Sequence, residues 1–159
     1  MHKVIGESKT FSKILVAVDE LKMSTASTNR AIDYAVSMAQ DYDAQLIILY
    51  VIKADPRIHG MNPPSHVIEI KKDAESSFAK IIENIHETEN NKKDRTLQIK
   101  KEIIASVRIA DAIVNYAKDN HVDLIVTGTR GRNKLTGAFL GSVASDVITS
   151  AYCPVLIAK

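Results

Sequence analysis

Runs of β-favouring apolar residues alternate with helix-spaced apolar stripes along this chain of 159 residues. The run KILVAVD (Lys13 to Asp19) is apolar at nearly every position, as is typical of a strand that is covered on both faces. Three further runs of this kind are QLIILYV (Gln45 to Val51), DLIVT (Asp123 to Thr127) and PVLIA (Pro154 to Ala158). Around Leu97 to Ile104 apolar and polar residues alternate, which predicts a strand with one wet face or edge.

Between these runs, apolar residues recur at spacings of three and four, which indicates helices. The first stripe follows four candidate caps (Ser24, Thr25, Ser27 and Thr28), and Ser106 is the expected cap of the third. Strict alternation of strand and helix implies right-handed crossovers and a parallel sheet. We therefore predict a five-stranded, doubly wound, Rossmann-like α/β domain with helices on both faces, spanning residues 13–159 after an extension at 1–12.

The amino-acid composition limits the kinds of partner that we expect this chain to bind. The 21 basic and 19 acidic side chains leave a formal net charge of +2, too little to gather nucleic acid by electrostatics. The sequence contains no apolar stretch long enough for a transmembrane span, so we expect no membrane partner. The single cysteine, Cys153, cannot form an intramolecular disulfide, which favours a reducing compartment, the cytoplasm. The five histidines have no metal-ligand spacing, and we assign no catalytic or metal-binding side chain.

Four of the six glycines lie in the segment that follows the fourth expected strand. They are Gly128, Gly131, Gly137 and Gly141, and the segment ends in Gly141-Ser142-Val143 at the start of an expected helix. Glycine lets a ligand approach the main chain, and the free N–H groups of a helix N-terminus attract phosphate. The competing interpretation is a loop made flexible by glycine, with Ser142 acting only as a helix cap.

The motif Gly128-Thr129-Arg130-Gly131, nine residues, then Gly141-Ser142 resembles the G-x2-G-x9-G-[ST] nucleotide motif of the universal stress protein family. The VAVD, LIILYV, DLIVTGTRGR and CPVLIA segments also follow the family's order from Lys13 to Lys159. The resemblance implies an adenine nucleotide α-hydrolase-like fold that binds ATP, with Mg2+ on its phosphates. There is no G-x4-GK-[ST] sequence, so an ordinary P-loop is excluded.

The resemblance also implies residue roles. Gly128, Gly131, Gly141, Ser142 and Val143 would hold the phosphates and the ribose, with Thr127 packing nearby. Ala17, Asp19 and Val51 would serve the nucleoside, and Asp19 has the reach to accept from a ribose hydroxyl or to touch Mg2+.

This sequence departs from the family at three places. Glu20 to Met23 replace a short Gly-Ser-containing turn, while Tyr50 and Arg130 replace two common histidines. None of these changes removes a backbone donor.

The function implied is a nucleotide-dependent stress-response module with little or no catalysis, acting on an unknown downstream protein. The alternatives are a slow ATPase or self-phosphorylating enzyme that uses Asp19, and a nucleotide-free, chaperone-like dimer. We also expect a homodimer, because the last strand is a short hydrophobic edge and the family commonly pairs it across a two-fold axis.

Overall fold

The computed structural model describes residues 11–18, 26–54, 65–89, 96–129 and 140–159. Strands and helices alternate along the chain as the sequence predicts. Their order is β1 (Lys13–Val18), α1 (Ala26–Tyr42), β2 (Gln45–Lys53), α2 (Ser65–Glu89), β3 (Ile99–Ser106), α3 (Ile109–Asp119), β4 (Leu124–Gly128), α4 (Ser142–Ser150) and β5 (Val155–Ala158). None of the helices in these ranges is both long and apolar enough to cross a bilayer.

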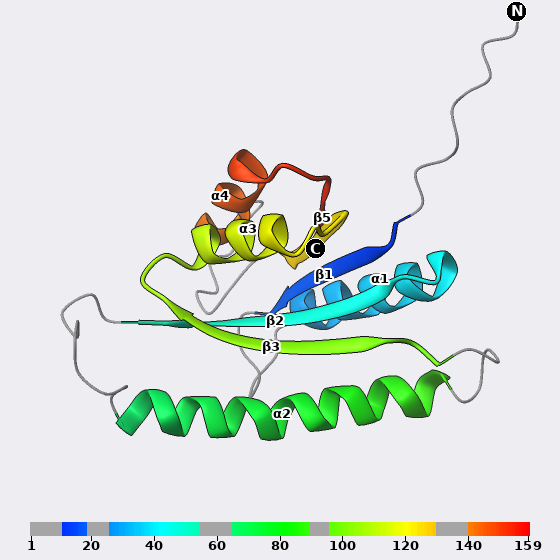
Figure 1. Ribbon diagram of the computed structural model, residues 1–159, viewed down its shortest axis with the longest axis horizontal. Coiled ribbons are helices and arrows are strands. Elements are labelled where there is room, and N and C mark those ends of the chain that lie inside the picture. The colour runs from blue at the N-terminus through cyan, green and yellow to red at the C-terminus, as the bar shows by residue number, and fades with distance from the viewer. Residues whose placement is uncertain (1–10, 19–25, 55–64, 90–95, 130–139) are drawn as a thin grey trace, which may run out of the picture.

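The five strands form one sheet in the order β3-β2-β1-β4-β5, and every neighbouring pair is parallel. The central strand β1 pairs with β2 through Ala17 and Leu49, and with β4 through Ala17 and Thr127. Figure 1 shows α3 and α4 on one face of the sheet, with α1 and α2 on the other. The predicted doubly wound α/β fold is therefore confirmed.

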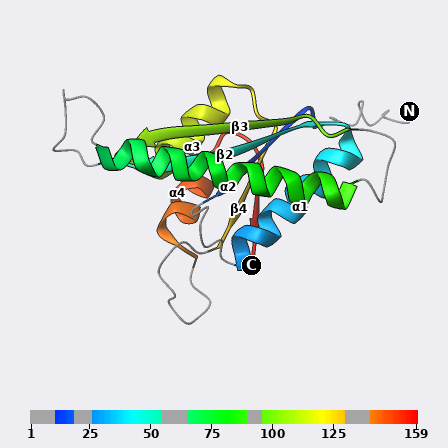
Figure 2. The same ribbon diagram turned by 90° about the horizontal axis from the view of Figure 1, so that it is seen from below.

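The two faces of the sheet carry separate hydrophobic cores. Alternate residues of β1 point to opposite faces, so Ile14 and Val16 pack with α1 and α2, whereas Leu15 and Ala17 pack with α3 and α4. Seen from the α2 side, as in Figure 2, α1 runs at an angle to α2, and both helices cover one core. Burial of β1 on both faces explains why its sequence is an unbroken apolar run.

The outer strands β3 and β5 are the two edges of the sheet. Most residues of β3 are only half-buried, and the strand carries three consecutive charged residues, Lys100, Lys101 and Glu102. The predicted wet edge around residues 97–104 is therefore confirmed. Charged side chains on an open edge oppose pairing with another chain.

Asp123 fixes the start of β1 against the start of β4. Its carboxylate accepts hydrogen bonds from the backbone N–H groups of Ser12 and Lys13, at 2.9 and 3.0 Å. The Asp123 N–H in turn donates to the carbonyl of Lys13 at 2.9 Å. These three bonds pin the register of the central strand pair.

One of the two expected helix caps differs in the structure, and the other falls partly outside the described residues. Helix α1 begins at Ala26, so Ser27 and Thr28 lie inside its first turn and are buried there, while Ser24 and Thr25 lie outside the described residues. Helix α3 has Arg108 as its N-cap, and Ser106 ends β3 instead. The Ser106 hydroxyl still accepts from the Arg108 N–H at 3.2 Å, because serine near a chain turn bonds local backbone.

Gly128 is the point where β4 meets the N-terminal turn of α1. A Cβ atom at Gly128 would lie 2.9 Å from Ser27 Oγ and 3.1 Å from the Ser27 carbonyl carbon. Both distances are shorter than ordinary van der Waals contact. The absence of a side chain at Gly128 therefore lets helix α1 pack closely on the sheet.

Replacing Gly128 by alanine is expected to lower the free energy of unfolding by about 1–3 kcal/mol, because the added methyl group overpacks against Ser27. Denaturant unfolding of Gly128→Ala, Ser27→Ala and the double variant would measure the coupling between the two sites. The double variant should lose less stability than the two single losses added together. Strict additivity, or a Gly128→Ala protein as stable as the parent, would contradict this close approach.

Candidate functional site

The connections of the sheet diverge between β1 and β4. From β1 the chain enters α1 on one face, and from β4 it enters the segment that leads to α4 on the other face (Figure 1). The carboxyl ends of β1 and β4 are adjacent in the sheet. In open α/β sheets such a divergence leaves a crevice outside the strand ends, where ligands bind.

Three residues expected to bind a nucleotide meet at this edge. Ala17 on β1 and Thr127 on β4 are register partners, while Val51 lies on β2 just beyond Tyr50, the last partner of β1. Strand alternation puts all three side chains on the face covered by α3 and α4. Each is less than a tenth exposed. The structure thus brings Ala17, Val51 and Thr127 to one face of one edge, whereas Asp19 lies outside the described residues.

The start of α4 lies over the same face. Val143 packs against the core that contains Ala17 and Val51. Gly141 is the N-cap, no side chain caps the helix, and the first intrahelical bond runs from Ser145 N–H to Gly141 C=O at 2.9 Å. The N–H groups of Ser142, Val143 and Ala144 precede that bond, so they have no acceptor within the helix. With no acidic residue in the first turn, the positive end of the helix dipole is not neutralised by its own helix.

The backbone of Gly141 does not require glycine. Its φ of −63° and ψ of 154° are open to any amino acid. A serine or aspartate there would give the helix a side-chain cap. Glycine instead leaves the helix terminus without one and lets a ligand come close to the main chain.

Thr129 joins the two ends of the glycine-rich segment. Its carbonyl accepts from the Gly141 N–H at 2.7 Å, and its own N–H donates to the Ala158 carbonyl at 2.9 Å. The two bonds fix the N-cap of α4 beside the end of β4 and the last residue of β5. The sequence did not predict this role of Thr129, because position 129 is one of the variable positions of the glycine motif. Gly131, Arg130 and the other residues at 130–139 lie outside the described residues.

Gly128 packs closely against helix α1, a contact that the sequence did not predict. It faces α1 and not the α4 side of the sheet, because its neighbour Val126 packs in the core under α1 and α2. Close packing against Ser27 accounts for glycine at this position without a ligand. A phosphate contact through the Gly128 backbone stays a prediction.

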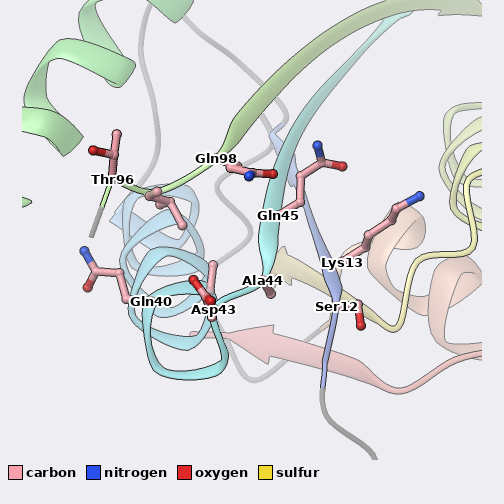
Figure 3. Close-up of a pocket in the computed structure, with 10 residues that line it drawn as sticks. Ser12, Lys13, Gln40, Asp43, Ala44, Gln45, Thr96 and Gln98 are labelled. Atoms are coloured by element: carbon pink, nitrogen blue, oxygen red, sulfur yellow. The ribbon is translucent and has the colours of Figure 1, made fainter. Parts of the chain in front are cut away.

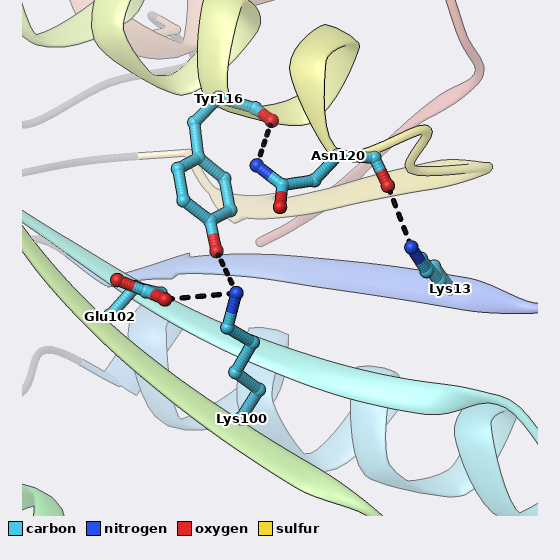
Figure 4. A network of polar contacts seen from close by, with 5 residues as sticks. All are labelled: Lys13, Lys100, Glu102, Tyr116 and Asn120. Atoms are coloured by element: carbon cyan, nitrogen blue, oxygen red, sulfur yellow. Dashed lines mark hydrogen bonds and ion pairs between the residues drawn. The ribbon is translucent and has the colours of Figure 1, made fainter.

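A polar cluster around Lys100 lies away from this edge. Lys100 on β3 pairs with Glu102 at 3.0 Å and donates to the Tyr116 hydroxyl on α3 at 3.2 Å (Figure 4). The hydrogen bonds to Glu102 and Tyr116 raise the pKa of Lys100, and burial raises the pKa of Tyr116. Because Lys100 pairs with Ile47 near the start of β2, this cluster ties the β3 edge to α3 near the amino ends of the strands, far from the carboxyl edge.

A shallow cavity of about 360 Å³ lies at the opposite, amino end of the strands. Its lining includes Gln40, Asp43, Gln45 and Gln98, and Figure 3 shows the Lys13 ammonium pointing away from Asp43. That ammonium donates to the Asn120 carbonyl at 3.0 Å (Figure 4). In the described ranges no three His, Cys, Asp or Glu side chains gather as metal ligands.

Comparisons with known proteins agree with this geometry. The model of the universal stress protein family matches residues 10–159. The universal stress protein YxiE of Bacillus subtilis (strain 168) is 36% identical over 155 residues, which cover 94% of this chain and 99% of YxiE.

Two solved structures share the fold. The universal stress protein from Archaeoglobus fulgidus in complex with dAMP has a TM-score of 0.65 at 22% identity, covering 94% of this chain and 99% of that one. A universal stress protein in complex with cAMP has a TM-score of 0.65 at 21% identity, covering 94% and 98%. The match of the family model over nearly the whole chain shows that the protein belongs to the universal stress protein family.

Proposed function

We propose that this protein binds ATP, with Mg2+ on its phosphates, at the carboxyl edge between β1 and β4. The observation that carries this proposal is the N-terminus of α4, which has no side-chain cap and lies over the sheet face that Ala17, Val51 and Thr127 share. Two relatives in the family hold dAMP and cAMP, which have an adenine base and a phosphate in common. The protein would act in the cytoplasm as a nucleotide-dependent stress-response module with little or no catalysis.

The phosphate end of the site would be the start of α4. The N–H groups of Ser142 and Val143 would donate to phosphate oxygens, with the backbones of Gly128 and Gly131 completing the cradle. A hydrogen bond to a charged group contributes about 1.5–3 kcal/mol. Three or four such bonds, together with burial of the base, are enough for the roughly 8 kcal/mol of micromolar affinity. Asp19 would serve the ribose or the Mg2+.

The base end would be the end of β2. The Gln45 N–H donates to the Ser12 carbonyl at 2.9 Å, whereas the Leu46 N–H donates away from β1, to the Gln98 carbonyl. Backbone groups alternate sides along a strand, so the N–H and carbonyl of Val51 face the side of β1, beyond the last β1–β2 pair. A carbonyl there suits the 6-amino group of adenine, and the buried side chains of Val51 and Ala17 suit its flat face.

We also propose a homodimer that pairs β5 with its copy. The Ile125 and Thr129 N–H groups donate to the carbonyls of Pro154 and Ala158, so these residues face β4. By alternation the backbone groups of Val155 and Ile157 face the open edge. An antiparallel partner strand would satisfy them, since an unpaired edge is a template for pairing. A two-fold axis would present both nucleotide sites to a downstream protein.

Gly141→Asp is expected to separate stability from nucleotide binding. The new carboxylate would cap α4 and raise the free energy of unfolding by several tenths of a kcal/mol to about 1 kcal/mol. The same carboxylate would occupy the N–H groups that the phosphates need and repel them, so ATP affinity measured by calorimetry should fall at least tenfold. Thr149→Asp, which adds the same charge at the other end of α4, should bind ATP as the parent does. A Gly141→Asp protein with unchanged affinity would place the phosphates elsewhere.

Pure protein incubated with ATP and Mg2+ is expected to release no more phosphate than a protein-free sample. The described side chains that we place in the site are those of Ala17, Val51, Thr127, Ser142 and Val143, and none of them takes up a proton at neutral pH. Phosphate release followed over hours would test this expectation, with Asp19→Ala as the comparison. Turnover that Asp19→Ala abolishes would make the protein a slow ATPase and overturn the non-catalytic assignment.

Ile157→Pro is expected to convert the dimer into a monomer with an intact sheet. Proline removes an N–H that faces the open edge and leaves every bond between β4 and β5 in place. Sedimentation at micromolar concentration would measure the mass, with Ile157→Val as the matched control that keeps the N–H. A parent chain that sediments as a monomer, or an Ile157→Pro protein that remains a dimer, would rule out pairing through β5.

A further inference from the structure

Thr127 has a buried hydroxyl group with almost no partner in the described structure. Four polar residues are buried there, namely Ser27, Thr28, Thr127 and Thr129. Ser27 and Thr28, in the first turn of α1, each interact with another group. The bond of the Thr127 hydroxyl is a contact of 3.5 Å with the carbonyl of the next residue, Gly128. That distance is the outer limit of a hydrogen bond and recovers little energy.

A buried hydroxyl such as that of Thr127 is unfavourable unless it finds a hydrogen-bond partner. A hydroxyl that is buried without a good hydrogen bond destabilises the folded protein, because it gave up its bonds to water. Thr127 is 7% exposed and lies at the edge where the sheet connections diverge. A buried polar group left unsatisfied by the protein at a candidate ligand site points to a bond that the ligand supplies.

The position of Thr127 indicates which part of the nucleotide it meets. Neighbouring strands are about 4.8 Å apart, so Thr127 lies one strand spacing from Ala17 and two from β2, where the base would bind. On its other side, two residues along the chain, Thr129 holds the N-cap of the helix that would bind the phosphates. Thr127 therefore lies between the base end and the phosphate end, where the sugar must lie.

We propose that the Thr127 hydroxyl hydrogen-bonds a hydroxyl of the ribose and makes the site prefer ribonucleotides to deoxyribonucleotides. A ribose hydroxyl, like that of threonine, both donates and accepts, so the two groups complete each other. A site with a group built to bond a substrate hydroxyl rejects an analogue that lacks it, because its own polar group is then left unpaired. This assignment rests on the proposed nucleotide site.

The test compares three proteins with three nucleotides. The parent, Thr127→Val and Thr127→Ser are each titrated calorimetrically with ATP, 2′-deoxy-ATP and 3′-deoxy-ATP. Thr127→Val should bind ATP about tenfold more weakly than the parent does. For one of the two deoxy nucleotides, parent and Thr127→Val should bind equally, which identifies the sugar hydroxyl concerned. Thr127→Ser keeps the hydroxyl and should restore the preference for ATP.

A second readout needs no nucleotide. Valine has the shape of threonine, so ligand-free Thr127→Val should melt at the same temperature as the parent or higher, because it removes a poorly bonded buried hydroxyl. A clear loss of stability would mean that the hydroxyl has a protein partner and would overturn the proposal. An equal loss of affinity for all three nucleotides, or no loss for ATP, would overturn it too. A parent that binds none of the three would overturn the proposed function itself.

Discussion

The central strand β1 and its register with β4 are the constraint on which the rest of the molecule depends. Ile14, Leu15 and Val16 are fully buried, so both cores of the protein meet on this strand. A slip of one residue would exchange the two faces and bring the wrong side chains into each core. The carboxylate of Asp123 opposes such a slip by holding the backbone N–H groups of Ser12 and Lys13.

The register of β1 with β4 positions the residues of the candidate site. The pairing that Asp123 fixes at the amino end of β1 also puts Ala17 beside Thr127 at the carboxyl end. The bond between Thr129 and Gly141 then positions the first turn of α4 above them. Ala17 and Thr127 are thus held in place by the sheet. The start of α4 is held beside them by the hydrogen bond between Gly141 and Thr129. Binding residues held by a scaffold of this kind need little reorganisation when a ligand arrives.

Much of the fold could be predicted from the sequence, because buried positions are apolar and recur with the spacing of a strand or a helix. The unbroken run at 13–19 marks a strand covered on both faces, and the mixed run at 97–104 marks an edge. Gly128 shows where such reasoning ends, since a glycine that admits a helix looks the same in sequence as one that admits a phosphate. The anchoring role of Thr129 was hidden because its contacts come from residues distant along the chain. The N-cap of α3 was predicted two residues too early, at Ser106 instead of Arg108, because a serine near a turn can bond local backbone without being the cap.

The hydrogen bond from Gly141 to Thr129 has a consequence for engineering. The chain departs from the sheet and returns to it at nearly one point, so the ends of the stretch at 130–140 are joined whatever lies between them. Closing a longer loop costs only about 0.6 kcal/mol for each doubling of its length. The described residues of both cores lie outside that stretch, so a peptide epitope or a fluorescent reporter grafted there would replace none of them. Its signal would arise beside the site proposed for the nucleotide, which suggests this fold as a scaffold for a genetically encoded sensor.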